Sequence, residues 1–182
     1  MTDHSAFIGN RKLAAGTLLD VALAAKPAID RGETVFIFDG ASQPVDIDFR
    51  GSAADLRARL TPPAPVEAPR GPGRPKLGVV AREITLLPRH WDWLGRQPGG
   101  ASVAMRKLVE DARRLNEDKD RARAAREVAY RFMSAMAGNL ANFEEATRAL
   151  FAGDGKRFAA MIEWWPEDIR EHVEGLAGDG VA

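Results

Sequence analysis

Six prolines between residues 62 and 75 constrain this chain more than any other feature of its sequence. Proline fixes φ and lacks a backbone N–H, so this stretch is held extended and cannot lie inside a sheet. We therefore predict a Pro/Gly-rich basic linker over residues 61–78. It separates a module at residues 1–60 from a domain at residues 79–177, which a disordered tail at residues 178–182 follows.

The first 60 residues are predicted to form a small α+β module in the order β-α-β-β-α. Strands are expected at residues 6–10 and 34–38, and at residues 45–49, where apolar residues alternate with aspartates. Thr17 is placed to cap a helix that Pro27 ends, and Ser52 to cap a second helix at residues 53–60.

Residues 79–177 are predicted to form a mainly helical unit that one strand opens, so the whole chain is α+β. The strand is expected at residues 79–87, and a short helix follows at residues 89–94 before a glycine turn. Ser102 is expected to cap the next helix, and the polar run 116–120 either bridges or interrupts it. Further apolar stripes predict helices up to residue 177. The buried face of the helix after Ser102 is expected to hold Met105, Leu108, Val109 and Ala112.

A formal net charge of zero hides an uneven distribution of charge along the chain. Residues 1–69 hold seven Lys/Arg against nine Asp/Glu, residues 70–126 hold fourteen against seven, and residues 127–182 hold five against ten. This basic block at residues 70–126 can bind an anion, or it can contact the acidic regions within one chain or between chains. Its charges can also simply be solvated helix faces.

Signatures of catalysis are few, and we predict that the protein is not an enzyme. The chain has no cysteine, which excludes disulfides, thiolate zinc sites and cysteine nucleophiles. It contains no Walker loop, nucleophile elbow or dinucleotide fingerprint. Its three histidines, His4, His90 and His172, lack the paired spacing of metal ligands, and His90 beside Asp92 is the one candidate acid–base pair.

Metals, cofactors and membranes find no support in the sequence either. Asp39, Asp46 and Asp48 are the nearest approach to a carboxylate cluster, but their spacing is not that of an EF-hand, and strand alternation already explains two of them. No run approaches the roughly 18 apolar residues that a membrane span needs. The first 30 residues also lack the apolar core of a signal peptide. We predict no cofactor, no metal and no membrane contact, and we expect a cytoplasmic protein.

The linker contains Gly73-Arg74-Pro75-Lys76, which resembles the core of an AT-hook. Such a core works because an extended arginine can lie in the narrow, strongly negative minor groove of A·T-rich DNA. The resemblance implies double-stranded DNA as a partner, with Arg74 in the groove. The alternative is a basic linker that only keeps two domains apart.

The order strand, short helix, glycine turn and longer helix is also that of a ribbon-helix-helix unit, which residues 80–115 resemble. This resemblance implies a homodimer whose paired strands enter the major groove, while the start of the second helix holds a phosphate. Glu83 opposes it by repelling phosphate, although it could accept from a cytosine amine. The candidate DNA-binding residues are Arg74, Lys76, Arg82, Thr85, Arg89, Gly100, Ala101, Ser102, Arg106 and Lys107.

A further resemblance is carried by residues 38–39, 48–51, 73–79, 82–94, 99–102, 106–110 and 129–138. These stretches extend over nearly the whole chain, and they resemble a bacterial family known as domain of unknown function 2239. The resemblance brings no activity and no catalytic residues with it. We therefore expect a non-enzymatic DNA-binding or regulatory protein, and the alternative is a protein-interaction or structural module that binds no nucleic acid.

Overall fold

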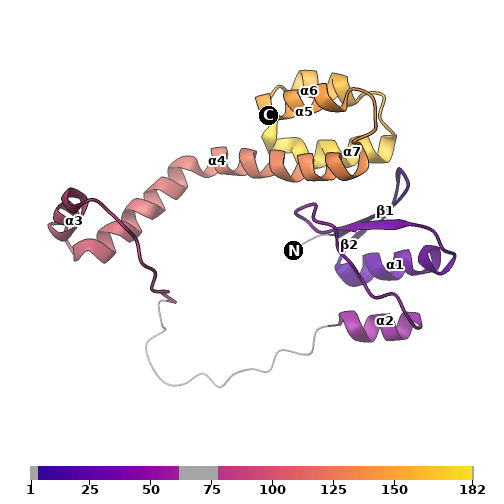
Figure 1. Cartoon of the computed structure of the whole chain (residues 1–182), viewed down its shortest axis with the longest axis horizontal. Coiled ribbons are helices and arrows are strands. Elements are labelled where there is room, and N and C mark those ends of the chain that lie inside the picture. Colours follow the sequence, from indigo (N-terminus) through magenta and orange to yellow (C-terminus); the bar gives the residue numbers. More distant parts are fainter. Residues whose placement is uncertain (1–3, 62–77, 182) are drawn as a thin grey trace. The chain divides into compact units, whose positions relative to one another are not determined.

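A computed structural model describes residues 4–61 and 78–181, which form two compact units (Figure 1). The first unit consists of Met1–Pro63 and Lys119–Ala182, and the second of Ala64–Asp118. This division differs from the predicted one, because the N-terminal module and the C-terminal helices belong to one unit. The predicted α+β class is confirmed by a small antiparallel sheet and seven α-helices among the described residues.

The sheet has three antiparallel strands in the order β2-β1-β3. Two of them, β1 and β3, lie where strands were predicted. The sequence analysis missed β2, because lysine, alanine and glycine form strands poorly. Gly9, with φ +54°, makes the turn between β1 and β2, and a bulge at Ala6/Phe7 shifts their register. The strand bounds are His4–Ile8 for β1, Arg11–Gly16 for β2 and Val35–Phe38 for β3.

The strand predicted at residues 45–49 does not form. Pairing with β3 stops at one bridge between Phe38 and Pro44, and the Val45 N–H donates to the carbonyl of Ile37 at 2.8 Å. The alternation that motivated the prediction is nevertheless present, because Val45, Ile47 and Phe49 are half-buried while the aspartates between them are exposed. Side-chain bonds around Asp48 bend the chain away from the sheet.

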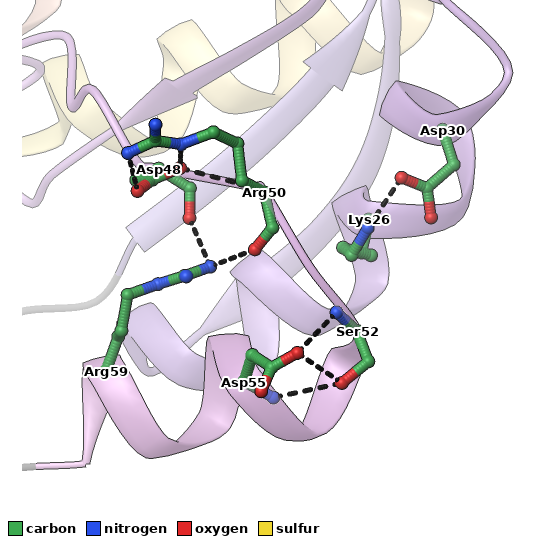
Figure 2. A network of polar contacts seen from close by, with 7 residues as sticks. All are labelled: Lys26, Asp30, Asp48, Arg50, Ser52, Asp55 and Arg59. Carbon is green, nitrogen blue, oxygen red and sulfur yellow. Dashed lines mark hydrogen bonds and ion pairs between the residues drawn. The ribbon is translucent and has the colours of Figure 1, made fainter.

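These bonds form a polar network between the loop and helix α2, Ala53–Leu60 (Figure 2). The Asp48 carboxylate accepts from the Arg50 N–H at 3.0 Å and from its guanidinium at 2.9 and 2.8 Å. Arg50 therefore holds the pKa of that carboxyl well below its usual range. From α2, the Arg59 guanidinium donates to the carbonyls of Asp48 and Arg50 at 2.8 and 2.5 Å. The loop thus has a fixed shape without ladder hydrogen bonds.

Two helices complete the N-terminal part, and both begin at the predicted caps. The Thr17 hydroxyl accepts from the N–H of Asp20, and Ser52 forms a reciprocal capping box with Asp55. The prediction that Pro27 ends the first helix is wrong, because the helix continues to Asp30. A proline this close to the C-terminal end of a helix removes only one intrahelical hydrogen bond. The helices are α1, Leu18–Asp30, and α2, Ala53–Leu60.

Helices form over the apolar stripes that were predicted to be helical up to residue 177. The long helix α4 runs through the polar segment 116–120 without a break, which decides between the two alternatives given by the sequence. Gly153 follows α5 in the left-handed conformation, and the Trp165 indole fixes the turn after α4 by donating to the Ala141 carbonyl at 2.8 Å. The bounds are Gly100–Met136 for α4, Phe143–Ala152 for α5, Gly155–Ile162 for α6 and Glu167–Ala177 for α7.

Alternate residues of the sheet face two different cores. Ala6 and Ile37 pack on α1, together with Val21 and Ala25. Phe7 and Phe38 point to the other face, where they meet Phe132 of α4 and the buried residues of α5, α6 and α7. The sheet is therefore covered by α1 on one side and by the C-terminal helices on the other.

The tail predicted to be disordered is ordered over residues 178–181. Gly178–Gly180 form a 3-10 helix, η1, and Gly180 is buried. The Arg126 Nε donates to the Gly180 carbonyl at 2.6 Å, and Arg121 forms an ion pair with Asp179 at 3.0 Å. The prediction of disorder rested on composition, and composition does not reveal the hydrogen bond and the ion pair that hold this segment. They also show that part of the basic block contacts the acidic C-terminal region within one chain.

His172 of α7 lies half-buried between the sheet and α4. Its ring centroid is 4.5 Å from that of Phe132 and 5.2 Å from that of Phe7. Lys12 and Ser5 are its polar neighbours, each at 3.4 Å. Burial, assisted by the charge of Lys12, lowers the pKa of His172 to about 4. The imidazole is therefore neutral in the folded protein at physiological pH.

We predict that Arg59→Ala destabilises the chain more than Arg57→Ala does. Both arginines are exposed on α2, but only Arg59 bonds the loop carbonyls of Asp48 and Arg50. Losing these bonds should lower the free energy of unfolding by roughly 1 kcal/mol. Urea unfolding measures this, and hydrogen exchange at the Arg50 amide reports the loop itself. Equal losses in the two variants would contradict the role given to Arg59.

We also predict that acid destabilises the fold through His172. Its folded pKa is depressed, so the stabilisation is complete above pH 6.5, the unfolded value, and is lost as the pH falls towards 4. Allowing for solvent screening of a half-buried group, the loss is on the order of 1 kcal/mol. Urea unfolding between pH 4 and 7 should show a weaker pH dependence in His172→Phe, whereas the exposed His90→Phe should behave like the parent. A His172→Phe profile identical to the parent profile would refute this account.

Candidate nucleic-acid interface

The predicted DNA-binding residues fall in the second unit and in the linker before it. Arg74 and Lys76 lie outside the described residues. The strand predicted at residues 79–87 is not formed, since residues 78–87 have no regular structure and pair with no described strand. A strand needs a hydrogen-bonding neighbour, and the chain offers none here. The ribbon-helix-helix resemblance is therefore not borne out.

The short helix after this segment forms as predicted. Helix α3, Pro88–Gly95, begins with Pro88 at its first position, where a missing N–H costs no intrahelical bond. Leu94 is its buried residue, whereas Trp91 and Trp93 remain exposed. The two indoles thus contribute little to the core of this unit.

Helix α4 starts two residues before the predicted cap. Gly99 and Gly100 both have positive φ, +85° and +76°, and the Gly100 N–H donates to the Gln97 carbonyl at 2.9 Å. Two successive left-handed residues are favourable only for glycine, so this pair fixes the start of the helix. Ser102 lies inside the first turn, where its hydroxyl accepts from the Arg106 guanidinium at 3.3 Å. The prediction that Ser102 caps the helix is therefore wrong.

A groove of about 630 Å³ lies between the irregular segment and the start of α4. It brings four of the predicted residues together, since Arg82 comes from the segment and Ala101, Ser102 and Arg106 come from the helix. The rest of its lining is apolar and includes Val79, Val80, Ile84, Trp91 and Met105.

The other predicted residues do not line this groove. Thr85, Arg89 and Gly100 lie in the same unit, and Lys107 borders a smaller hollow of about 200 Å³ beside Trp93. The sequence analysis thus located part of one surface, but it did not predict that the surface is largely apolar.

Several basic side chains here lack an acidic partner. Within residues 4–61 and 78–181, no carboxylate lies within ion-pair distance of Arg82, Arg89, Arg106 or Lys107. Further along α4 the situation differs, because Arg113 and Arg114 both pair with Glu110. Between Arg82 and Arg114, the cations without a carboxylate partner therefore lie before residue 108.

The apolar face predicted to be buried in α4 is mostly exposed. Of the four residues in this face, Leu108 and Val109 are 46% and 57% exposed, and Ala112 is also exposed. The spacing of these residues identified a face but not what covers it, since a core and a partner surface have the same period. Sequence alone therefore could not show that this face lies bare in a single chain.

No acid–base or metal constellation adds to this surface. The three histidines lie on β1, α3 and α7, and the exposed His90 side chain makes no hydrogen bond or ion pair within the described residues. In the part of the chain that the structure describes, no three side chains of His, Asp or Glu gather as metal ligands do. Asp39, one of the aspartates considered, instead binds the N–H groups of Ala41 and Gln43. No helix in the described ranges has the length and apolar character for crossing a bilayer.

Comparison with known proteins identifies one family and gives no functional relative. No curated protein and no solved structure matches the chain. One family model, described as an uncharacterized protein conserved in bacteria (DUF2239), matches residues 3–177, almost the full length. The chain therefore belongs to this uncharacterised bacterial family, DUF2239.

Proposed function

We propose that this protein is a non-enzymatic DNA-binding or regulatory protein whose second unit contacts double-stranded DNA. The observation that supports the proposal is the group of basic side chains without acidic partners at Arg82, Arg89, Arg106 and Lys107. Such side chains can neutralise backbone phosphates and release condensed counterions, which is the main source of sequence-independent affinity.

The arrangement of these cations is suited to phosphate rather than to base recognition. Arg82 and Arg106 border one groove, and Ser102 offers a hydroxyl between them. Without a strand at residues 79–87, no pair of strands is available for insertion into the major groove. We assign any sequence preference to Arg74 and Lys76 of the Gly-Arg-Pro stretch, which resembles an AT-hook core.

A protein-interaction module is the second candidate function. The observation that favours it is the exposure of large apolar side chains, Trp91, Trp93, Val109 and Leu115 among them, in the same unit. Aromatic and aliphatic side chains of this size are typical of the buried centre of an interface. This candidate requires no nucleic acid.

We predict that duplex binding weakens steeply with salt and depends on the groove cations. The double variant Arg82→Ala/Arg106→Ala should lower the slope of log K against log salt by about 0.9 for each phosphate that is no longer neutralised. Fluorescence anisotropy with a mixed-sequence duplex across a salt series measures this slope. Arg148→Ala/Arg157→Ala removes the same charge from arginines that pair with Glu145, and it should leave the slope unchanged. Absence of binding even at low salt would overturn the proposal.

A preference for A·T-rich DNA should depend on Arg74. Because an extended arginine is favoured by the narrow minor groove, Arg74→Ala should reduce affinity for an A·T-rich duplex and leave a G·C-rich duplex nearly unaffected. Arg70→Ala, in the same linker but outside the Gly-Arg-Pro core, serves as the control. Competition gel shifts with the two duplexes compare these variants. An equal loss on both duplexes would reduce Arg74 to a phosphate contact.

A further inference from the structure

Helix α4 carries an apolar stripe that no described residue covers. Leu108, Val109, Ala112 and Leu115 are spaced as one helical face, and all four are exposed. Met105 lies one turn earlier on this face and also lines the groove with Val79, Val80, Ile84 and Trp91. The apolar surface thus continues from the groove along α4 to Leu115.

The described residues of the second unit, 78–118, bury few apolar side chains among themselves. Among its described residues, Leu94 and Ala104 are the buried apolar ones. A unit of this size, Ala64–Asp118, is close to the lower limit for a stable core, and association with another chain is a common way to gain one. The exposed stripe is therefore the surface through which this unit would gain a core.

Area and charge both identify a second copy of the chain as the occupant. The exposed parts of Leu108, Val109, Ala112 and Leu115 amount to on the order of 400 Å², close to the apolar share of the area that a standard interface takes from each partner. The charged side chains from 106 to 118 are balanced, so the surface neither repels its own copy nor selects a partner of one sign. They are Arg106, Lys107, Arg113 and Arg114 against Glu110, Asp111, Glu117 and Asp118.

We propose that the protein is a homodimer in which the Met105–Leu115 face of α4 packs against the same face of a second copy. A twofold contact uses one patch twice, so the full apolar stripe is buried on both chains. Ala112, the smallest residue of the stripe, lies near its middle and allows the two helices to approach closely. This contact does not depend on DNA binding and is tested without DNA.

The first test is the mass of the full chain in solution. Sedimentation at micromolar concentrations should give twice the 19.8 kDa of one chain. Leu115→Glu should raise the dissociation constant at least about tenfold, because a carboxylate would be buried against an apolar helix. Trp164→Glu is the matched control, since Trp164 is 82% exposed in the first unit and Leu115 is 83% exposed. Both positions are so exposed that the fold of the single chain should survive, which circular dichroism verifies.

The second test locates the contact, and the absence of native cysteine makes it specific. Ala112→Cys should form a disulfide-linked dimer under mild oxidation, because the two Ala112 positions approach one another across the twofold axis. Arg114→Cys, two residues on and therefore on the opposite side of the helix, should remain largely uncrosslinked. A monomer at all concentrations, a dimer indifferent to Leu115→Glu, or equal crosslinking of the two cysteine variants would each overturn the proposal.

Discussion

The contact of Phe7 and Phe38 with Phe132 holds the first unit together. The ring centroids lie 5.1 Å apart for Phe7 and Phe132 and 5.4 Å apart for Phe38 and Phe132, in tilted and edge-to-face geometry. All three rings are buried, and they join a sheet from the start of the chain to a helix in its second half. The second unit is inserted in the sequence between Phe38 and Phe132. Because the entropy cost of closing a loop grows only slowly with loop length, this insertion adds little to the cost that the contact must offset.

Thr17 and Ser52 were predicted correctly as helix caps, because each acts on the backbone within one turn. Pro27 and Ser102 carry equally local signals but do not mark the helix boundaries predicted from them. The strand at residues 45–49 failed for a non-local reason. Its alternation correctly gave the inner and outer faces, but Arg59, eleven residues after Asp48, bonds the carbonyls around the bend. Such distant bonds leave no periodic trace in a sequence.

The candidate site was predicted less completely than the fold. Sequence reasoning placed Arg82, Ser102 and Arg106 in one segment, and the structure brings them to one groove. It predicted that Leu108 and Val109 are buried, but no described residue of a single chain covers them. Periodicity reports only that a face avoids water, and whether the same chain or another covers it is decided by tertiary structure. The family assignment shows that related proteins occur in bacteria, but it identifies no site residue.

The end of the chain influences how much of the basic block is exposed to other molecules. A Cβ at Gly155 would lie 2.3 Å from the Val181 carbonyl oxygen, and one at Gly180 would lie 2.8 Å from the Arg126 side chain. The absence of side chains at these two positions is what lets residues 178–181 lie against α4. In that position the Gly180 carbonyl accepts a hydrogen bond from the Arg126 guanidinium. Asp179 in this segment pairs with Arg121 of α4, so the ordered segment reduces the positive field of the helix.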